Sequence, residues 1–231
     1  MPTDNHLTPG IQFDAVTVMK KLKGLRPEKS PGLDGVHPMV LQQTAEVVAD
    51  PLARIFQASC GVLPADWIKA NVVPIYKKAA ARTDANNYRP VSLTSVPCKI
   101  MESIIKDAVL SHIESNDLIT GHQHGFVSGR SCLTNLLEVL EAWTRVLDSG
   151  CGVDIVYLDY KKAFDAVPHG RLLQKLSMFG NGNSTLQWIK SFLEEKQMKV
   201  TVRSSCSHWV EVVSGVPQKK GSVLGPLLFL I

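Results

Sequence analysis

The sequence predicts an α+β fold in which helices come first and mixed helices and strands follow. Some segments carry apolar residues at helical spacing, and others form short β-branched runs or alternate apolar with polar residues. Proline and glycine separate these segments, without an internal repeat or a low-complexity tract. With 231 residues, 45% of them hydrophobic and 20% charged, the chain can bury a sizeable core as one large or two small domains.

The N-terminal part is predicted to be mainly helical. A stripe of apolar residues at helical spacing opens it: Phe13, Val16, Met19 and Leu22. Residues 23–35 are too rich in glycine, proline and charge to be anything but a loop. Residues 37–59 then predict two short helices, divided at Asp50 and Pro51 because proline interrupts helical hydrogen bonding.

The middle of the chain predicts one strand and two helices. Residues 69–76 form an apolar, β-branched run, and residues 77–88 follow as a polar loop. Two amphipathic stripes come next: Met101, Ile104, Ile105 and Ala108 in the first helix, and Leu133, Leu136, Leu137, Leu140 and Leu147 in the second. Residues 123–129, which include glycines, are predicted to be the loop between these helices.

A strand, turn and helix unit is predicted after these helices. Residues 153–159 (VDIVYLD) are a short apolar run that ends in a carboxylate. Residues 169–179 predict a helix with Gly180 as its stop signal. A further helix would be capped by Asn183 or Ser184.

The C-terminal part predicts a β-hairpin and an apolar end. Residues 198–203 alternate apolar with polar or charged side chains, and residues 209–213 are predicted to be the returning strand. Residues 222–231 (SVLGPLLFLI) are apolar and lack a cap or a polar tail, which is not typical of a natural domain boundary. We therefore expect that the natural domain continues past them.

Composition excludes several classes of protein. The five cysteines are scattered, with no Cys-x-x-Cys pair, so a disulfide framework and a zinc ribbon are both disfavoured. No apolar run approaches the roughly 18 residues that cross a bilayer, and the polar N-terminus does not resemble a secretory signal. We expect an intracellular protein, in the nucleus or the cytoplasm. A net charge of +4 is compatible with a polyanionic partner but does not establish one.

Asp159 is the candidate catalytic residue. An acid at the end of a buried strand can be held rigidly beside open space, where metal-assisted nucleotidyl transfer needs a hard oxygen ligand for magnesium. Asp159 and Asp165 have an alternative interpretation as turn residues. A phosphatase of the haloacid-dehalogenase kind needs a second aspartate two residues later, where Lys161 stands, so that class is excluded.

The stretch around Asp159 resembles a known family. Residues 153–176 (VDIVYLDYKKAFDAVPHGRLLQKL) are similar to the first palm motif of reverse transcriptases from non-LTR, LINE-like retrotransposons. Further blocks resemble the fingers and the second palm motif of that family, at residues 30–38, 72–78, 87–102, 123–137, 214–218 and 221–229. Because these blocks follow the family's order, the resemblance is far more specific than any single motif.

The resemblance implies a right-hand polymerase fold with the fingers and a partial palm, and with the thumb absent. Residues 1–29 would be a lead-in helix and loop, and residues 30–231 a partial reverse transcriptase domain. Within that domain, the fingers would take about 30–150 and the partial palm about 151–231. The implied activity is RNA-directed DNA polymerisation, with an RNA template, a DNA primer and deoxynucleoside triphosphates as partners. Neither a membrane nor a protein partner is indicated.

The implied chemistry is a two-metal mechanism with magnesium. Asp159 would bridge both ions, and the backbone carbonyl of Tyr160 would supply a further oxygen. Phe164 matches the aromatic residue that lies under the nucleotide sugar and excludes a 2′-hydroxyl, which favours DNA synthesis. Ordinary core packing is the alternative interpretation of Phe164.

Basic residues of the fingers are candidates for binding the triphosphate of the incoming nucleotide. Arg89 is the strongest candidate, with Lys77, Lys78 and Arg82 in the loop before it. The two lysines have an equally good interpretation as solvated surface charge. Gln218 matches a family residue near the nucleotide and template base, or it is a turn residue after the proline before it.

Gly125, Gly129 and Arg130 are the candidates for template binding, because glycine permits close backbone approach. A simple loop with a helix start at the next residue explains them equally well. His122 and His124 have no cysteine or acid partner nearby in the sequence, so we expect surface histidines.

The sequence departs from the family pattern at two places. Lys219 and Lys220 intervene between Gln218 and Gly221, which could displace the residues on either side. The family also carries a later aspartate pair and a thumb that this sequence does not contain. We therefore expect an incomplete two-ion site and no polymerisation by this chain alone, as in a truncated element copy. The alternative is a non-catalytic remnant that binds RNA through its basic fingers.

Overall fold

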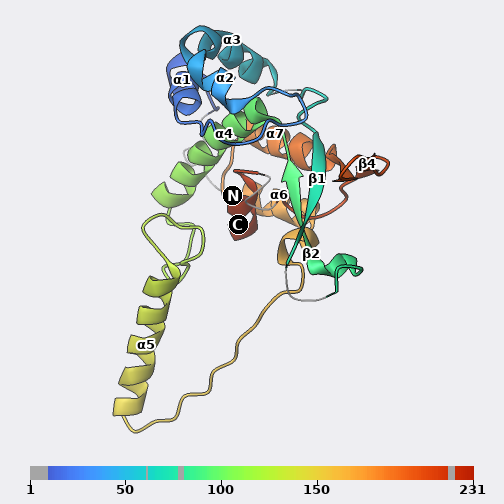
Figure 1. The fold of residues 1–231 in the computed structure, drawn as a ribbon. Helices are drawn as coiled ribbons and strands as arrows, with labels where there is room; N and C mark the ends of the chain where they lie inside the picture. The colour runs from blue at the N-terminus through green and yellow to red at the C-terminus, as the bar shows by residue number, and fades with distance from the viewer. Residues whose placement is uncertain (1–9, 61, 78–80, 218–221) are drawn as a thin grey trace.

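The computed structural model describes residues 10–60, 62–77, 81–217 and 222–231, and it has mixed helix and strand content. The helices α1 (Ala15–Lys23), α2 (Pro38–Gln43) and α3 (Ala45–Ala58) gather at one end of the molecule (Figure 1). The long helix α4 (Val96–Ser115) starts beside this group and runs away from it toward the lower left of the view (Figure 1). The predicted order of helices before mixed elements is confirmed.

Helix α1 forms where the sequence predicts it, but its buried face differs from the predicted stripe. The Asp14 side chain accepts a hydrogen bond from the Thr17 amide at 2.8 Å and caps the helix. Val18 and Leu22 are fully buried, whereas Val16 is 70% exposed. The buried stripe therefore follows a spacing of four residues, and Val16 lies on the solvent side.

The predicted division at Asp50 and Pro51 is wrong. The break between the two helices lies at Thr44, and Pro51 is inside α3. Pro51 faces solvent, so the carbonyl that loses its helical partner remains accessible to water. The buried face of α3 continues through this point, with Ala49 and Phe56 on either side of the proline, and this packing holds the helix together.

Helix α4 is the central element of the core. Its apolar residues Met101, Ile104 and Ile105 are buried as the sequence predicts. The Ser95 hydroxyl accepts a hydrogen bond from the Cys98 amide at 3.3 Å at the start of the helix. None of the described helices is both long and apolar enough to cross a membrane.

The sheet joins segments that are far apart in the sequence. Its strands are β1 (Lys69–Tyr76), β2 (Tyr88–Leu93), β3 (Gln197–Val202), β4 (Ser205–Cys206) and β5 (Val210–Glu211). The order is β2-β1-β3-β4, with β5 also paired to β3. Strands β1 and β2 are antiparallel, with Ile75 opposite Arg89, and β1 is parallel to β3. The predicted strand at 69–76 and the predicted hairpin are confirmed.

Further helices come from the C-terminal part of the chain. Helix α6 (His169–Met178) ends before Gly180, which adopts a φ of 78° and is the predicted stop. Helix α7 (Asn183–Glu194) is confirmed, but Gly182 is its N-cap, without a side-chain cap hydrogen bond, instead of Asn183 or Ser184. The short helix α8 (Gly225–Leu230) buries Leu227 and Leu228.

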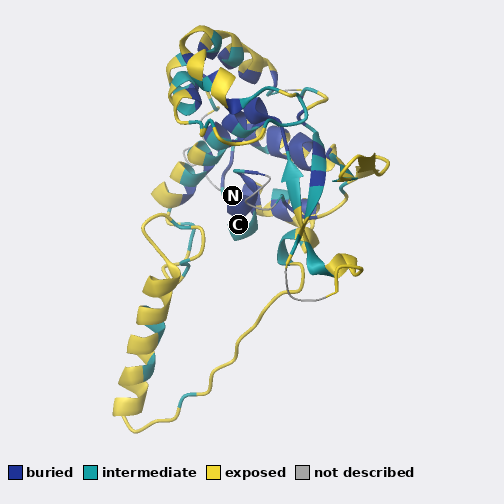
Figure 2. Ribbon diagram, viewed as in Figure 1, coloured by how far each residue is buried: buried dark blue, intermediate teal, exposed yellow. Residues whose placement is uncertain are grey.

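Helix α5 (Cys132–Asp148) and residues 149–160 form an arm that extends away from the body (Figure 1). Figure 2 shows that nearly all of this arm is exposed, and Leu133, Leu136, Leu137, Leu140 and Leu147 are 56–66% exposed. The predicted strand at 153–159 is wrong, because these residues have no regular structure. No described strand lies beside them to complete backbone hydrogen bonds, and a strand forms only with such a partner.

Candidate functional site

Four cationic side chains line one open pocket, which we call the basic pocket. Lys77 and Arg82 come from the β1–β2 loop, Arg89 comes from β2, and Lys162 comes from the turn before α6. The carboxylate of Asp165 lines the same pocket. The pocket lies where β1, β2 and β3 meet this turn, so residues separated by more than seventy positions reach one space.

Within the β1–β2 hairpin, Lys77 is held by backbone carbonyls and Arg82 by an aromatic ring. The Lys77 amide donates to the Asn87 carbonyl, and the Lys77 amine donates to the Asn86 carbonyl, both at 2.9 Å. The Arg82 guanidinium lies over the Tyr76 ring, 5.3 Å from its centroid. These contacts leave the positive charge of both side chains without a bonded carboxylate among the described residues.

The turn that carries Lys162 and Asp165 has an unusual backbone. Lys162 adopts a left-handed conformation with a φ of 53°, and its carbonyl accepts hydrogen bonds from the Asp165 and Ala166 amides at 2.9 and 3.1 Å. The short helix η3 (Ala163–Ala166) follows from these bonds. Such a conformation is uncommon outside glycine and persists where the surrounding structure fixes it.

A second segment, residues 214–216, clamps this turn. The Gly215 amide donates to the Val167 carbonyl and the Val216 amide donates to the Phe164 carbonyl, both at 2.8 Å. The buried His169 ring nitrogen Nε2 bonds the Gly215 carbonyl at 2.8 Å. The structure thus brings together the two blocks that the sequence predicts to be palm motifs.

Phe164 packs between two other aromatic rings. It stacks on Phe229 of α8, with ring centroids 4.3 Å apart and planes at 19°, and it meets the edge of Phe126 at 6.1 Å. Phe164 is half-buried against the core, whereas the neighbouring Asp165 faces the basic pocket. The alternative interpretation of Phe164 as a packing residue therefore holds here, and its contact with a sugar stays a prediction.

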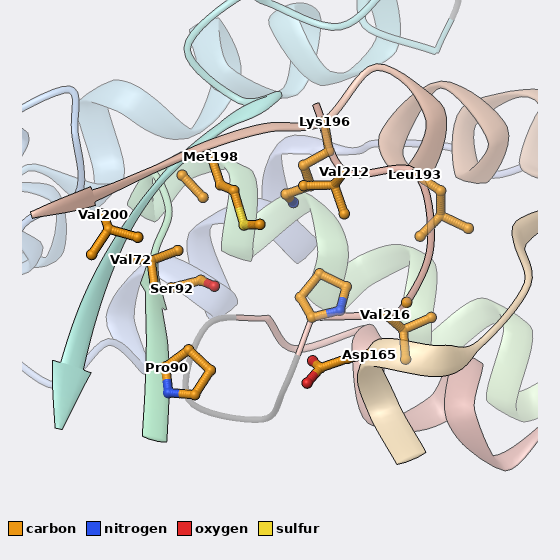
Figure 3. A pocket seen from close by; sticks show the side chains of 13 residues that line it. Val72, Pro90, Ser92, Asp165, Leu193, Lys196, Met198, Val200, Val212 and Val216 are labelled. Carbon is orange, nitrogen blue, oxygen red and sulfur yellow. The ribbon is translucent and has the colours of Figure 1, made fainter. Parts of the chain in front are cut away.

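An apolar cavity adjoins the basic pocket. Leu193, Met198 and Val216 line it, and Pro90 and Asp165 line both spaces. Figure 3 shows the carboxylate of Asp165 pointing across the lower end of this cavity toward Pro90. One negative charge therefore stands at the boundary between an apolar and a strongly basic space.

Asp159 and Tyr160 lie outside this site. Both are on the exposed arm, with Tyr160 77% exposed, and neither lines the basic pocket. Within the ranges that the structure describes, no group of three or more histidine, cysteine, aspartate or glutamate side chains is placed to hold a metal ion. These residues therefore do not fit a two-ion metal site, because the strand that was to position Asp159 is not formed.

The loop that contains Gly125, Gly129 and Arg130 is held by its own arginine. The Arg130 guanidinium donates to the Gly121 carbonyl and, at 2.9 Å, to the Gln123 carbonyl. Gly129 adopts a φ of 74°, which favours glycine. Template contact by these residues stays a prediction. Gln218, the inserted lysines after it and Lys78 lie outside the described residues.

The structure gives the two histidines an acid partner that the sequence does not predict. Glu138 of α5 bonds His122 Nδ1 at 2.5 Å and His124 Nε2 at 2.8 Å. Hydrogen bonds from both histidines lower the pKa of Glu138. His122 is an exposed histidine as predicted, whereas the His124 side chain is only 8% exposed. Glu138 is one helical turn after Thr134, which also bonds His124, so helical spacing was the available signal.

Comparisons with known proteins point to one family. A family model described as reverse transcriptase (RNA-dependent DNA polymerase) matches residues 75–231. The chain is 30% identical over 216 residues to a probable RNA-directed DNA polymerase from transposon BS of Drosophila melanogaster, covering 93% of this chain and 24% of that protein. It is 31% identical over 206 residues to the RNA-directed DNA polymerase from mobile element jockey of the same organism, covering 88% and 22%.

A more distant relative is the Pol polyprotein from the type-1 retrotransposable element R2 of Nasonia vitripennis, at 27% identity over 171 residues, covering 73% of this chain and 16% of that protein. The chain thus spans about a quarter of the length of the first two relatives, at 24% and 22%. The family model covers the four cations of the basic pocket, the clamped turn and α8 together. The chain therefore belongs to the reverse transcriptase family, as a reverse transcriptase domain of the non-LTR retrotransposon kind.

Proposed function

We propose that this chain is a nucleotide- and template-binding part of a retrotransposon reverse transcriptase, and that it does not polymerise by itself. The observation that carries the proposal is the basic pocket, in which Lys77, Arg82, Arg89 and Lys162 meet. A deoxynucleoside triphosphate is the ligand that suits it, because clustered cations stabilise the charge of several phosphates.

The charged side chains of the basic pocket set the direction in which the nucleotide lies. Phosphates are repelled by the Asp165 carboxylate, so the triphosphate lies toward Arg89 and Lys77. The sugar then lies toward Asp165, which can accept a hydrogen bond from a sugar hydroxyl. Phe164, next to Asp165, borders the sugar in this arrangement.

The place of the template and primer is proposed on the same ground, the attraction of cationic side chains to phosphates. Arg89 is exposed on β2, at the edge of the β1–β2 hairpin, and the loop at 121–130 reaches Phe164 through Phe126. We propose that an RNA template with a DNA primer lies between this hairpin and this loop, with Gly125, Gly129 and Arg130 on the template side. Binding to phosphates by cationic side chains depends strongly on salt.

Reverse transcriptases generally use divalent metal ions. We propose Mg²⁺ as the ion. Asp159 and the Tyr160 carbonyl are the ligands that the family resemblance implies, but on the exposed arm they do not form a site for it in this structure. Among the described residues, no group of three or more histidine, cysteine, aspartate or glutamate side chains is placed to form such a site. For this reason we expect binding without polymerisation. The same observation favours the alternative of a non-catalytic RNA-binding protein.

Nucleotide binding by an Arg89→Ala variant tests the proposal. We expect dTTP to bind the variant about tenfold or more weakly, because a lost hydrogen bond to a charged group costs about 1.5–3 kcal/mol. The matched control is Arg54→Ala, which removes an equal charge from the exposed surface of α3. Equal affinities for the Arg89→Ala protein and the control would contradict the proposal. Salt-sensitive RNA binding with no dTTP binding by the unsubstituted chain would support the RNA-binding alternative.

A further inference from the structure

A carboxylate is buried in the middle of the core. Glu102 of α4 is 0% exposed, and its neighbours on the helix, Met101 and Ile105, are buried and apolar. A buried charge is costly unless hydrogen bonds or opposite charges compensate it. Its contacts therefore explain why a glutamate occupies this position.

Three donors from one short segment bond a single oxygen of this carboxylate. Glu102 Oε2 accepts hydrogen bonds from the Ser222 hydroxyl, from the Val223 amide at 2.9 Å and from the Leu224 amide at 3.2 Å. The Ser222 hydroxyl also accepts a hydrogen bond from the Gly225 amide at 3.0 Å. Glu102 thus fixes the residues that lead into α8.

The other side of the carboxylate faces a buried lysine and a buried thiol. The Cys98 thiol donates to Glu102 Oε1 at 3.8 Å. The Lys196 ammonium is buried, 3.7 Å from the Phe192 ring centroid, with no hydrogen-bond partner among the described residues. Burial lowers the pKa of Lys196, and the charge of Glu102 opposes that shift.

Helix α8 connects the residues that Glu102 bonds to the proposed nucleotide site. A Cβ on Gly225 would collide with the Pro217 carbonyl oxygen, so the start of α8 packs tightly against the residue that directly follows the clamping segment 214–216. At the other end of α8, Phe229 stacks on Phe164. A shift of α8 therefore moves the surface on which the Phe164 ring rests.

We infer that Glu102 is a positioning residue for the nucleotide site, because through α8 it fixes where the Phe164 ring lies. This role rests on the proposed function in one respect: Phe164 borders the nucleotide sugar. The coupling of Glu102 to Phe164 through packing does not depend on a nucleotide. The two parts are therefore measured separately.

The coupling is tested by hydrogen exchange in the full chain. In Glu102→Gln, which keeps the shape and removes the charge, we expect the amides of residues 164–167 and of 223–230, except Pro226, to exchange at least threefold faster. Ser222→Ala, which removes one donor and leaves two, gives the same pattern more weakly and is decisive if Glu102→Gln does not fold. Glu46→Gln, an exposed glutamate paired with Lys23, is the control and leaves both segments unchanged. Faster exchange at 223–230 alone would overturn the inference.

The consequence for the site is tested by the ratio of dATP to ATP affinity. We expect Phe164→Ala and Glu102→Gln each to lower this ratio about threefold or more, and the double variant to lower it no further than Phe164→Ala, because residues in one chain of contacts are not additive. Additive effects in the double variant would overturn the positioning role. A ratio that Phe164→Ala does not change would instead refute the proposed sugar contact, and the exchange experiment would still decide the coupling.

Discussion

At the scale of single residues, Gly215 connects the two blocks that build the site. Its φ of 89° lies in the region that favours glycine, and an added Cβ would lie 2.8 Å from the Asp165 Cα and carbonyl oxygen. Its amide and carbonyl bond Val167 and His169. The residue thus combines a required backbone conformation with a close approach that leaves no room for a side chain.

We expect Gly215→Ala to destabilise the protein by about 1–3 kcal/mol, because the variant meets both the backbone strain and the contact with Asp165. Denaturant unfolding measures the change. Gly170→Ala is the control, because Gly170 lies in α6 with nothing near its Cβ position. The control should be unchanged or more stable by up to about 1 kcal/mol. Equal stability of Gly215→Ala and the parent chain would show that the turn does not need glycine.

At the scale of elements, α5 in the arm forms as its local sequence pattern predicts, but it does not pack against the body. Helix α5 forms, and its apolar stripe is present, with a capping box at Ser131 and Thr134. None of its residues is buried, however, so the stripe contributes little to the stability of the body. A helix of this length gains most of its stability from packing when it has a partner.

Leucine truncations in two helices test this difference. Leu176→Ala in α6 removes a fully buried side chain, so we expect a loss of about 2–5 kcal/mol. Leu140→Ala in α5 removes a side chain that is 57% exposed, so we expect a change within about 0.5 kcal/mol. Chemical denaturation of both variants provides the comparison. A large loss in Leu140→Ala would mean that α5 packs against another surface in solution.

At the scale of the whole molecule, the candidate catalytic residue and the candidate binding site are separated. The basic pocket belongs to the body, whereas Asp159 is on the exposed arm. Polymerisation requires the carboxylates, the nucleotide and the primer end in one place, since a misplacement of about 1 Å costs on the order of a hundredfold in rate. Binding and chemistry are therefore expected to be separable in this chain.

Primer extension with Mg²⁺ measures this separation. We expect neither the chain nor its Asp159→Ala variant to extend a DNA primer on an RNA template, whereas both bind dTTP with the same affinity. A retroviral reverse transcriptase in a separate reaction with the same components is the positive control for the assay. Extension by the unsubstituted chain that is lost in Asp159→Ala would show that Asp159 is catalytic here and that the chain is active alone.

Local patterns alone predicted most of the elements. The strand at 69–76, the helix at 169–179 with its glycine stop, and the alternation from 198 onward depend on neighbouring residues, so the structure reproduces them. The order of the blocks also predicted the family, and the matched residues 75–231 confirm it. Arg89 and Lys77, which the sequence offers as phosphate-binding cations, do line one pocket, and their binding to phosphate stays a prediction.

The tertiary structure decided which of these elements have a partner. Residues 153–159 carry a strand pattern, but a strand needs a neighbouring backbone, and none of the described strands lies beside them. The roles of Lys162, Gly215 and Glu102 likewise depend on contacts between segments far apart in the sequence. The sequence by itself determined the family, through the order of its blocks, and most of the local elements, because these depend on neighbouring residues. Only the long-range packing decided that the basic pocket is assembled while Asp159 lies outside it.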